Sequence, residues 1–235
     1  MKVIFLNCWF AQVGQPFFDF IKQNVAGADI FCLSEVHPEL FSQLQKKLPN
    51  FAGFYEQGLY GGGMGFIYGQ AIFVRKVIKA ENLGRLELYR NVPIDMGFGW
   101  PFKLENKGQV FYLMNVHGKS LPGTKLDTSV RLRQSRKIIN CFAGLTGPKI
   151  IGGDFNLLPD TRSVELFEQA SYRDLIKQFK IKNTRTRLAW ERYPEEKKQF
   201  FADYVFVSPE VKVKDFQVPD IEISDHLPLI LDFEV

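Results

Sequence analysis

The chain has 235 residues, of which 46% are hydrophobic and 24% are charged, proportions that are ordinary for a soluble globular protein. Its 30 basic and 26 acidic residues leave a net charge of +4, a mild preference for anionic partners that does not by itself indicate nucleic acid. No apolar stretch of the sequence approaches the roughly 18 residues that a membrane-spanning helix requires. We therefore expect a protein without a membrane span.

The first residues lack the long apolar region and the small-residue cleavage site of a signal peptide. The three cysteines, Cys8, Cys32 and Cys141, are odd in number and lack metal-type spacing, which is typical of reduced thiols. We therefore expect a cytoplasmic protein. The length fits one large domain as well as two small ones, and the oligomeric state stays open.

The N-terminal part alternates predicted strands and helices. Apolar runs predict strands over Lys2–Cys8 and Ala28–Leu33. Apolar residues at helical spacing predict a helix over Phe17–Val25, opened by Pro16, and another helix that begins at Pro38.

From Phe51 to Phe111 the pattern changes to short strands separated by glycines, with no helix, as in a mostly antiparallel sheet. After a strand at Val110–Val116, Asp127 is the predicted N-cap of a helix over 128–143. The remaining predicted elements are a strand at Ile150–Gly152, a helix at Ser163–Gln169, and strands at Asp203–Val207, Val211–Val218 and Leu227–Phe233. No linker interrupts the pattern, so we predict a single α/β domain over residues 1–235, with two stacked sheets and helices outside.

The stretch Lys149–Leu157 combines a buried strand with polar residues at its end. The apolar run leads into two glycines, and Asp154 and Asn156 follow with one residue between them. Residues two apart in an extended chain share a face, so Asp154 and Asn156 should project together while Phe155 turns into the core. The glycines permit a bend or the close approach of a ligand. The pair suits a cation and a phosphoryl oxygen, and an ordinary polar turn is the equally weighted alternative.

Five polar clusters stand where predicted apolar strands end, and a sixth begins a strand. One such cluster is explained by a turn, because polar residues turn well. A whole set that is rich in acid, amide and imidazole is harder to explain in this way. The set comprises Asn7, Glu35, Asn115 with His117, Asp154 with Asn156, Asp225 with His226, and Asp203.

In their order along nearly the whole chain, these clusters resemble the motifs of the endonuclease/exonuclease/phosphatase superfamily. The resemblance implies a four-layered α/β sandwich of two mostly antiparallel sheets flanked by helices, and hydrolysis of phosphate esters with Mg²⁺ or Mn²⁺. Two departures bear on substrate contacts: Ser34 stands where glutamine is common, and Phe201-Ala202 precedes Asp203 where an arginine-containing pair is common. The matching segments are Asn7, Ser34-Glu35, Asn115-Val116-His117, Gly153-Asp154-Phe155-Asn156, Asp203-Tyr204-Val205-Phe206 and Ser224-Asp225-His226-Leu227-Pro228.

The resemblance implies a role for each acid and amide. Mg²⁺ prefers oxygen ligands and usually takes one or two carboxylates, so Glu35 is the expected direct ligand, with Asn7 and Asp225 near the ion or its waters. Asp154 would orient and deprotonate the attacking water, and Asn156 would hold that water or a phosphoryl oxygen.

The histidines complete the implied set. Asp203 would hold the ring of His226 in one tautomer, and His226 would stabilise the phosphoryl group or act as the base. Whether Asp154 or His226 takes the proton stays open. His117 would lie near the leaving group, and Asn115 would bind the substrate and position its neighbours. If Asp225 and His226 both serve the site, the backbone must turn between them, because adjacent strand residues face opposite ways.

Three basic residues are predicted to contact the substrate. Lys119 and Lys125 lie in a loop that precedes a helix start, where phosphate binds well, and Arg185 lies in a loop that mixes cations with aromatic residues. Arg131, with its basic neighbours on the predicted helix 128–143, is more simply read as a solvated side chain.

The leading hypothesis is a metal-dependent phosphodiesterase whose partner is nucleic acid, that is, a nuclease acting on DNA or RNA. A phosphatase or a lipid or inositol-phosphate phosphoesterase on the same scaffold is the second reading. An inactive binding module is the third, and it is disfavoured because the site set is complete.

Overall fold

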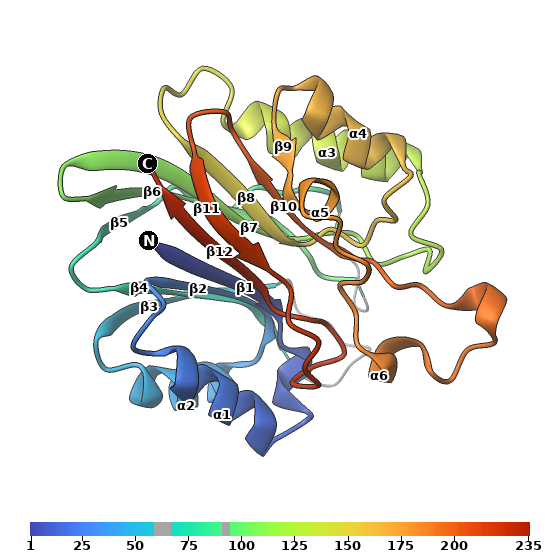
Figure 1. Ribbon diagram of the computed structural model, residues 1–235, viewed down its shortest axis with the longest axis horizontal. Coiled ribbons are helices and arrows are strands. Elements are labelled where there is room, and N and C mark those ends of the chain that lie inside the picture. The colour runs from blue at the N-terminus through green and yellow to red at the C-terminus, as the bar shows by residue number, and fades with distance from the viewer. Residues whose placement is uncertain (59–66, 91–94) are drawn as a thin grey trace.

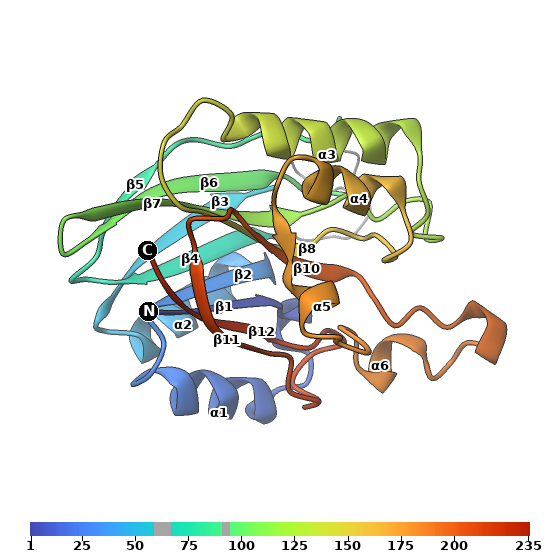
Figure 2. The ribbon, with the colours of Figure 1, turned by 45° about the horizontal axis from the view of Figure 1, so that its top comes forward.

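Two six-stranded sheets lie face to face at the centre of the computed structural model, and helices cover the outer face of each sheet (Figure 1, Figure 2). The structure describes residues 1–58, 67–90 and 95–235. These four layers are the predicted α/β sandwich. In the described part of 51–111 no residue is helical, as the glycine-punctuated pattern predicted.

The first sheet has the strand order β11-β12-β1-β2-β4-β3, and only β1 and β2 run parallel. Helices α1 and α2 cover its outer face (Figure 1). The bounds are β1 Lys2–Asn7, β2 Ile30–Val36, β3 Phe51–Gln57, β4 Gly69–Arg75, β11 Lys212–Gln217, β12 Leu229–Glu234, α1 Gln15–Asn24 and α2 Pro38–Lys47.

The second sheet has the order β5-β6-β7-β8-β10-β9, with β7 and β8 parallel. Helices α3 and α4 cover it (Figure 2). The bounds are β5 Lys79–Asn82, β6 Gly99–Asn106, β7 Gln109–His117, β8 Lys149–Asp154, β9 Arg173–Asp174, β10 Asp203–Val207, α3 Ser129–Cys141 and α4 Arg162–Gln169. The short helices are η1 Trp9–Ala11, α5 Leu175–Gln178, α6 Arg187–Trp190 and η2 Glu195–Lys197.

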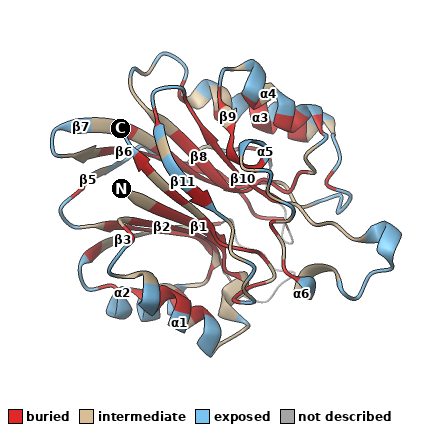
Figure 3. Cartoon of the chain, viewed as in Figure 1, coloured by how far each residue is buried: buried red, intermediate tan, exposed pale blue. Residues whose placement is uncertain are grey.

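Strand alternation decides which side chains face the opposite sheet. In β1, Val3 and Phe5 belong to the core between the sheets, whereas Ile4 and Leu6 pack under α1 and α2. Both faces of the strand are therefore buried, as Figure 3 shows for the central strands. Asn7 continues the inner face of β1, so its side chain points toward the second sheet.

The polar strand ends meet at one edge of the sandwich. Parallel β1 and β2 end there with Asn7 and Glu35, and parallel β7 and β8 end there with His117 and Asp154. Strand β10 runs antiparallel to β8, so its first residue, Asp203, pairs with Asp154. The topology therefore brings both sheets' polar residues to the same place.

The predicted cap of α3 is wrong. Thr128 is the N-cap, and its hydroxyl accepts from the backbone N of Arg131 at 3.1 Å. Asp127 instead accepts from the backbone N atoms of Arg162 and Ser163 at 2.8 and 3.0 Å, so it caps the start of α4. Threonine caps well, and Asp127 is left free to serve a helix 35 residues away.

The solvated reading of Arg131 is also wrong. Its side chain is fully buried, and its guanidinium donates to the backbone carbonyls of Lys119, Ser120, Pro122 and Leu126 at 2.7 to 3.2 Å. A guanidinium carries five N–H donors, which here tie down the loop between β7 and α3.

Two expectations from composition can be compared with the structure. Cys8 and Cys32 are buried free thiols, and Cys141 is a half-buried free thiol. Among the helices of the described ranges, none combines the length and the apolar character that crossing a membrane would take.

Candidate active site

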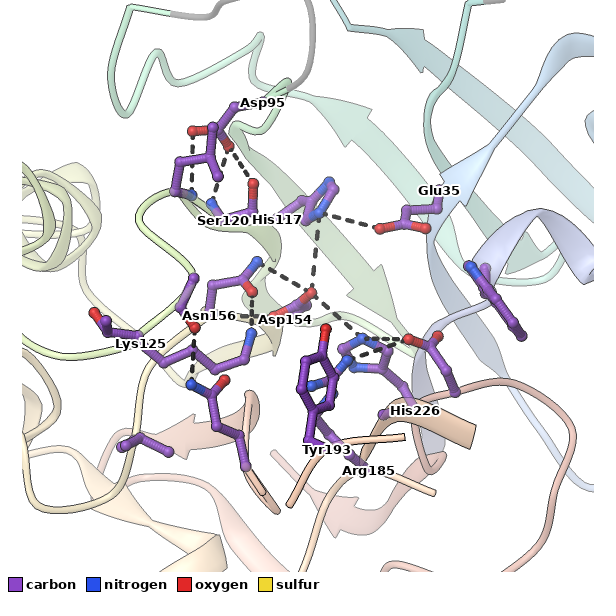
Figure 4. A pocket seen from close by; sticks show the side chains of 18 of the residues that line it. Glu35, Asp95, His117, Ser120, Lys125, Asp154, Asn156, Arg185, Tyr193 and His226 are labelled. Carbon is purple, nitrogen blue, oxygen red and sulfur yellow. Dashed lines mark hydrogen bonds and ion pairs between the residues drawn. The ribbon is translucent and has the colours of Figure 1, made fainter. Parts of the chain in front are cut away.

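A cavity of about 960 Å³, called here the site cavity, opens at the edge where the two sheets present their polar strand ends (Figure 4). Glu35, His117, Asp154 and His226 all line it. These residues are far apart in the sequence, and the structure places them around one hollow, as the cluster pattern predicted.

Glu35 reaches the site cavity because β2 is irregular at this residue. Simple alternation would turn Glu35 toward the helices, where Phe31 and Leu33 pack. The register shifts between Ser34 and Val36, and Glu35 has a φ of +57°. Left-handed backbone at a residue other than glycine is strained and is common at functional sites. The irregularity turns the carboxylate inward.

Asn7 joins the two sheets at the site. Its Nδ2 donates to Glu35 Oε1 at 3.0 Å and to Asp154 Oδ2 at 3.1 Å. Its Oδ1 accepts from the backbone N of Trp9 at 3.1 Å, which fixes the orientation of the amide. One amide nitrogen therefore holds a carboxylate from each sheet.

Asp154 and Asn156 lie side by side. The backbone N of Asn156 donates to Asp154 Oδ1 at 2.9 Å, and its Nδ2 lies 3.3 Å from Asp154 Oδ2. Phe155 between them is fully buried and packs edge-to-face on Phe167 and Tyr204. The alternation that the spacing predicted is therefore present.

The two glycines before Asp154 allow packing within the protein rather than the approach of a ligand. A Cβ on Gly152 would lie 2.7 Å from the ring of Phe5 in the opposite sheet. Gly153 has a φ of +124°, and a Cβ there would collide with the carbonyl oxygen of Val116. Both positions require glycine for steric reasons.

His226 is held by Asp203. Its Nδ1 lies 2.8 and 3.0 Å from the two carboxylate oxygens of Asp203, and both side chains are buried. Nε2 is left to face Asp154 Oδ2 and Asp225 Oδ2, each at 3.8 Å. The chain bends at 223–225 before β12 begins, which meets the geometric requirement that Asp225 and His226 both reach the site.

Neighbouring charges shift the pKa values of the two candidate proton acceptors, Asp154 and His226, in opposite directions. Burial alone would lower the pKa of His226, but the carboxylates of Asp203, Asp225 and Asp154 raise it to about 9. Burial alone would raise the pKa of Asp154, but His226 and the Lys125 ammonium, with a smaller effect of His117, lower it to about 2. Asp154 is therefore a carboxylate at neutral pH, and His226 carries a proton.

Glu35 and Asp225 form the acidic side of the site cavity. Burial raises the pKa of Glu35, and the negative charge of Asp225 raises it further against the opposing effect of His117. A divalent cation between these carboxylates would relieve both penalties, and the carboxylate oxygens of Glu35 and Asp225 suit Mg²⁺ or Mn²⁺. Asn7 presents its NH₂ group to Glu35, so it would orient that carboxylate and not ligate the ion. The residues present therefore fit the ion that the sequence predicted.

His117 lies at the opposite wall from His226. Its Nε2 is 3.7 Å from Glu35 Oε1 and 3.9 Å from Asp154 Oδ2 (Figure 4). Asn115, two residues earlier, does not line the site cavity. Its Nδ2 donates to Gln70 Oε1 at 2.8 Å, so its contact is with the opposite sheet.

The three predicted substrate cations are placed differently. Lys125 is buried within the site cavity wall, and its Nζ donates to Asn156 Oδ1. Arg185 lines the cavity and pairs with Asp225 at 3.2 Å. Lys119 does not line it, and its Nζ is paired with Asp95 at 2.6 Å.

Several cavity residues were not found from the sequence. Trp9 and Phe10 line the opening, and both have left-handed backbone, with φ of 44° and 56°. Their position directly after Asn7 was the available signal. Leu121 and Leu126 also line it and are exposed by 39% and 53%. Tyr193, which belongs to the loop of cations and aromatic residues marked in the sequence, lines it as well and is 56% exposed. Apolar and aromatic side chains therefore stand beside charged ones such as Lys197 and Lys198 at the cavity.

Comparisons with known proteins agree with this architecture. A sequence model of the endonuclease/exonuclease/phosphatase family matches residues 5–226. A search of curated protein sequences finds no significant match.

Solved structures supply the other comparison. The endonuclease/exonuclease/phosphatase from Bacteroides vulgatus is 22% identical, with a TM-score of 0.76 over 100% of this chain and 98% of that one. TDP2 of D. rerio, solved with a single-strand DNA product, is 18% identical, with a TM-score of 0.79 over 100% and 99%. The mannosyl-6-phosphatase of Bacteroides thetaiotaomicron is 19% identical, with a TM-score of 0.72 over 100% of both chains.

Identities this low establish a shared fold and leave the substrate open. The family model, however, covers most of the chain, including every polar cluster from Asn7 to His226. This chain therefore belongs to the endonuclease/exonuclease/phosphatase family of metal-dependent phosphoesterases.

Proposed function

We propose that this protein hydrolyses phosphodiesters with a divalent metal ion, and that its substrate is a DNA or RNA strand. The observation that carries the proposal is the convergence of Glu35, Asp154, His226 and His117 on one cavity, with Asn7 bonded to acids from both sheets. A carboxylate pair for a cation, a third carboxylate for water and two imidazoles for phosphoryl charge are the groups that this chemistry needs.

Glu35 and Asp225 would hold Mg²⁺ or Mn²⁺, and Asn7 would fix the Glu35 carboxylate. When bound, the ion supplies positive charge to the phosphoryl oxygens and to the departing oxygen. The Arg185 guanidinium, 3.2 Å from Asp225, stands beside the same position. Its Nε is buried and has no hydrogen-bond partner within the described residues.

Asp154 would orient the attacking water and accept its proton. One of its oxygens is fixed by the backbone N of Asn156, and the other faces the two histidines across the cavity. His226, which carries a proton, would donate from Nε2 to a phosphoryl oxygen while Asp203 holds Nδ1. This charge distribution supports Asp154 as the base, a choice that the sequence left open.

His117 would serve the departing oxygen. It lies beside Glu35 and Asp154, on the opposite wall from His226, so the reacting phosphorus would stand between the two rings. A histidine that can hydrogen-bond the leaving oxygen stabilises its charge or protonates it.

The rim favours nucleic acid over a fully polar substrate. Trp9 and Tyr193 can stack on bases, and Lys197 and Lys198 line the cavity on the Tyr193 side. Aromatic rings with nearby cations are the usual way to hold single-stranded nucleic acid, with stacking worth about 1–3 kcal/mol per base. An inositol phosphate or a sugar phosphate offers no planar group to such a rim.

The test is a substrate panel run with Mg²⁺ or Mn²⁺: bis-p-nitrophenyl phosphate, labelled DNA and RNA oligonucleotides, nucleotides, inositol phosphates and sphingomyelin. We expect turnover of the diester and of at least one oligonucleotide. Asp154→Asn should reduce it at least 100-fold, whereas Asp215→Asn, an exposed change on β11, should leave it unchanged.

Equal turnover by wild type and Asp154→Asn would show that the measured activity does not belong to this site. A clear preference for inositol phosphates or sphingomyelin would replace the nuclease reading by a phosphatase or lipid phosphoesterase. Mn²⁺ binding without turnover of any panel member would indicate a binding module.

A further inference from the structure

The site cavity offers two places where a cation could sit. One is the Glu35 and Asp225 side described above. The other lies deeper, where Asp154, Asp203 and His226 each place one potential ligand atom within 4.8 Å of the others. Two-ion phosphoesterases place their ions about 3.5–4 Å apart, so the geometry raises the question of whether this protein uses one ion or two.

Most of the donor atoms at the deeper place are already engaged. His226 Nδ1 is bonded to both oxygens of Asp203. Asp154 Oδ2 accepts from Asn7, and Asp154 Oδ1 accepts from the backbone N of Asn156. The side-chain oxygen of Asn156 accepts from the Lys125 ammonium. Each of these contacts is internal to the protein and leaves few free lone pairs for a metal ion.

Burial and backbone contacts restrain Lys125. It is only 6% exposed, and its backbone is left-handed, with a φ of +56°. Its carbonyl accepts from the backbone N of Leu158 at 3.0 Å, which joins its loop to the segment after Asn156. A flexible surface lysine would have none of these restraints.

Two buried charges hold the loop that carries Lys125. Arg131 donates to four carbonyls of this loop. Asp95 accepts from the backbone N and the hydroxyl of Ser120, each at 2.9 Å, and pairs with Lys119. A fixed scaffold therefore holds the Lys125 ammonium against Asn156, which in turn contacts Asp154.

We infer that the Lys125 ammonium takes the place of a second cation, so that the site cavity binds a single divalent ion, at Glu35 and Asp225, and Lys125 holds a non-bridging oxygen of the phosphate ester. The inference rests on the proposed function in that the cavity must bind a phosphate ester. A lysine ammonium is a compact point charge that binds phosphate well, and it needs none of the coordinating oxygens that an ion would require.

Calorimetric titration of the metal-free protein with MnCl₂ tests the number of ions. We expect one equivalent for the wild type. Inorganic phosphate is then titrated into the Mn²⁺-loaded protein. Lys125→Met should weaken phosphate binding at least tenfold while the first Mn²⁺ equivalent binds as before, and Lys125→Arg should recover part of the phosphate affinity.

Lys22→Met is the matched control, because Lys22 is exposed on α1 and does not line the site cavity; it should change phosphate affinity less than threefold. Thermal unfolding of each variant checks that it is folded. Two Mn²⁺ equivalents on the wild type, or unchanged phosphate binding by folded Lys125→Met, would overturn the inference.

These outcomes separate the inference from the proposed function. One Mn²⁺ equivalent and Lys125-dependent phosphate binding, without turnover of any diester, would uphold the role of Lys125 and contradict the hydrolase. Diester turnover with two Mn²⁺ equivalents would uphold the hydrolase and contradict the single-ion site.

Discussion

Gly152→Ala should drive the two sheets apart at the place where the site is built. The new Cβ would lie 2.7 to 2.8 Å from three ring carbons of Phe5, whereas carbon atoms in contact prefer about 3.5–4.0 Å. The ring must therefore retreat by about 0.7 Å or more. Phe5 is fully buried, so the displacement is passed to β1 and β8.

The expected loss of stability follows from this overlap. Overpacking a core by one methyl group costs about 1–3 kcal/mol. Taking about 2 kcal/mol, a chain of this length should lose about 4–8 °C in melting temperature.

The same displacement acts on the site. Asn7 lies two residues after Phe5, and Asp154 lies two residues after Gly152, so the 3.1 Å hydrogen bond between them spans the widened gap. Lengthening it by about 0.7 Å takes it beyond hydrogen-bond range. Misplacements of this size cost about tenfold to a hundredfold in rate, so kcat/KM on bis-p-nitrophenyl phosphate should fall at least tenfold.

Urea and thermal denaturation, together with the diester assay, measure both effects. Gly27→Ala is the control, since a Cβ at Gly27 meets nothing within 4 Å. In the Phe5→Leu background, Gly152→Ala should cost less stability, with a coupling of about 1 kcal/mol in the double-mutant cycle. If Gly152→Ala matches Gly27→Ala in melting temperature and turnover, the spacing argument is refuted.

Three further predictions concern single buried groups. Burial raises the pKa of Asp174 to about 6 from 3.8, so the folded protein binds this proton more tightly than the unfolded chain, and stability falls as pH rises between those values. Asp174→Asn keeps the cap of α5 and should add up to about 3 kcal/mol at pH 7 and nothing below about pH 4, as urea denaturation across that range would measure. Asp203→Asn should lower kcat by about 10²–10⁴ by releasing the His226 ring, with Mn²⁺ affinity unchanged in calorimetry. Arg131→Met should cost about 2–4 kcal/mol in urea denaturation and speed proteolysis within 118–127, whereas Arg133→Met, exposed on the same helix, should do neither.

The layered fold could be predicted because its signals are local. Apolar runs with polar ends gave the central strands, and helices α1 and α2 follow from Pro16 and Pro38 in their first turns. The short elements β9, α5 and α6 were missed, since two to four residues carry too little periodicity.

The sequence indicated which residue types form the site, but it did not indicate as well which groups each of them contacts. Glu35 illustrates the difference: its motif marked it, but the irregularity that turns it inward depends on pairing with β4. Lys119 and Arg131 show the same limit. Their charges suggested phosphate and solvent, whereas Asp95 and a set of loop carbonyls, distant in sequence, decide where those charges go.

The contacts of Asp95 and Arg131 with the loop 118–127 also determine whether the entropy cost of ordering this cavity wall falls on folding or on binding. Asp95 and Arg131 hold its backbone before any ligand arrives, so the lost chain entropy belongs to folding and not to binding. A phosphate ester then meets a ready-made surface, and its affinity is not reduced by loop closure. This side of the cavity therefore recognises a ligand by shape and charge without first having to rearrange.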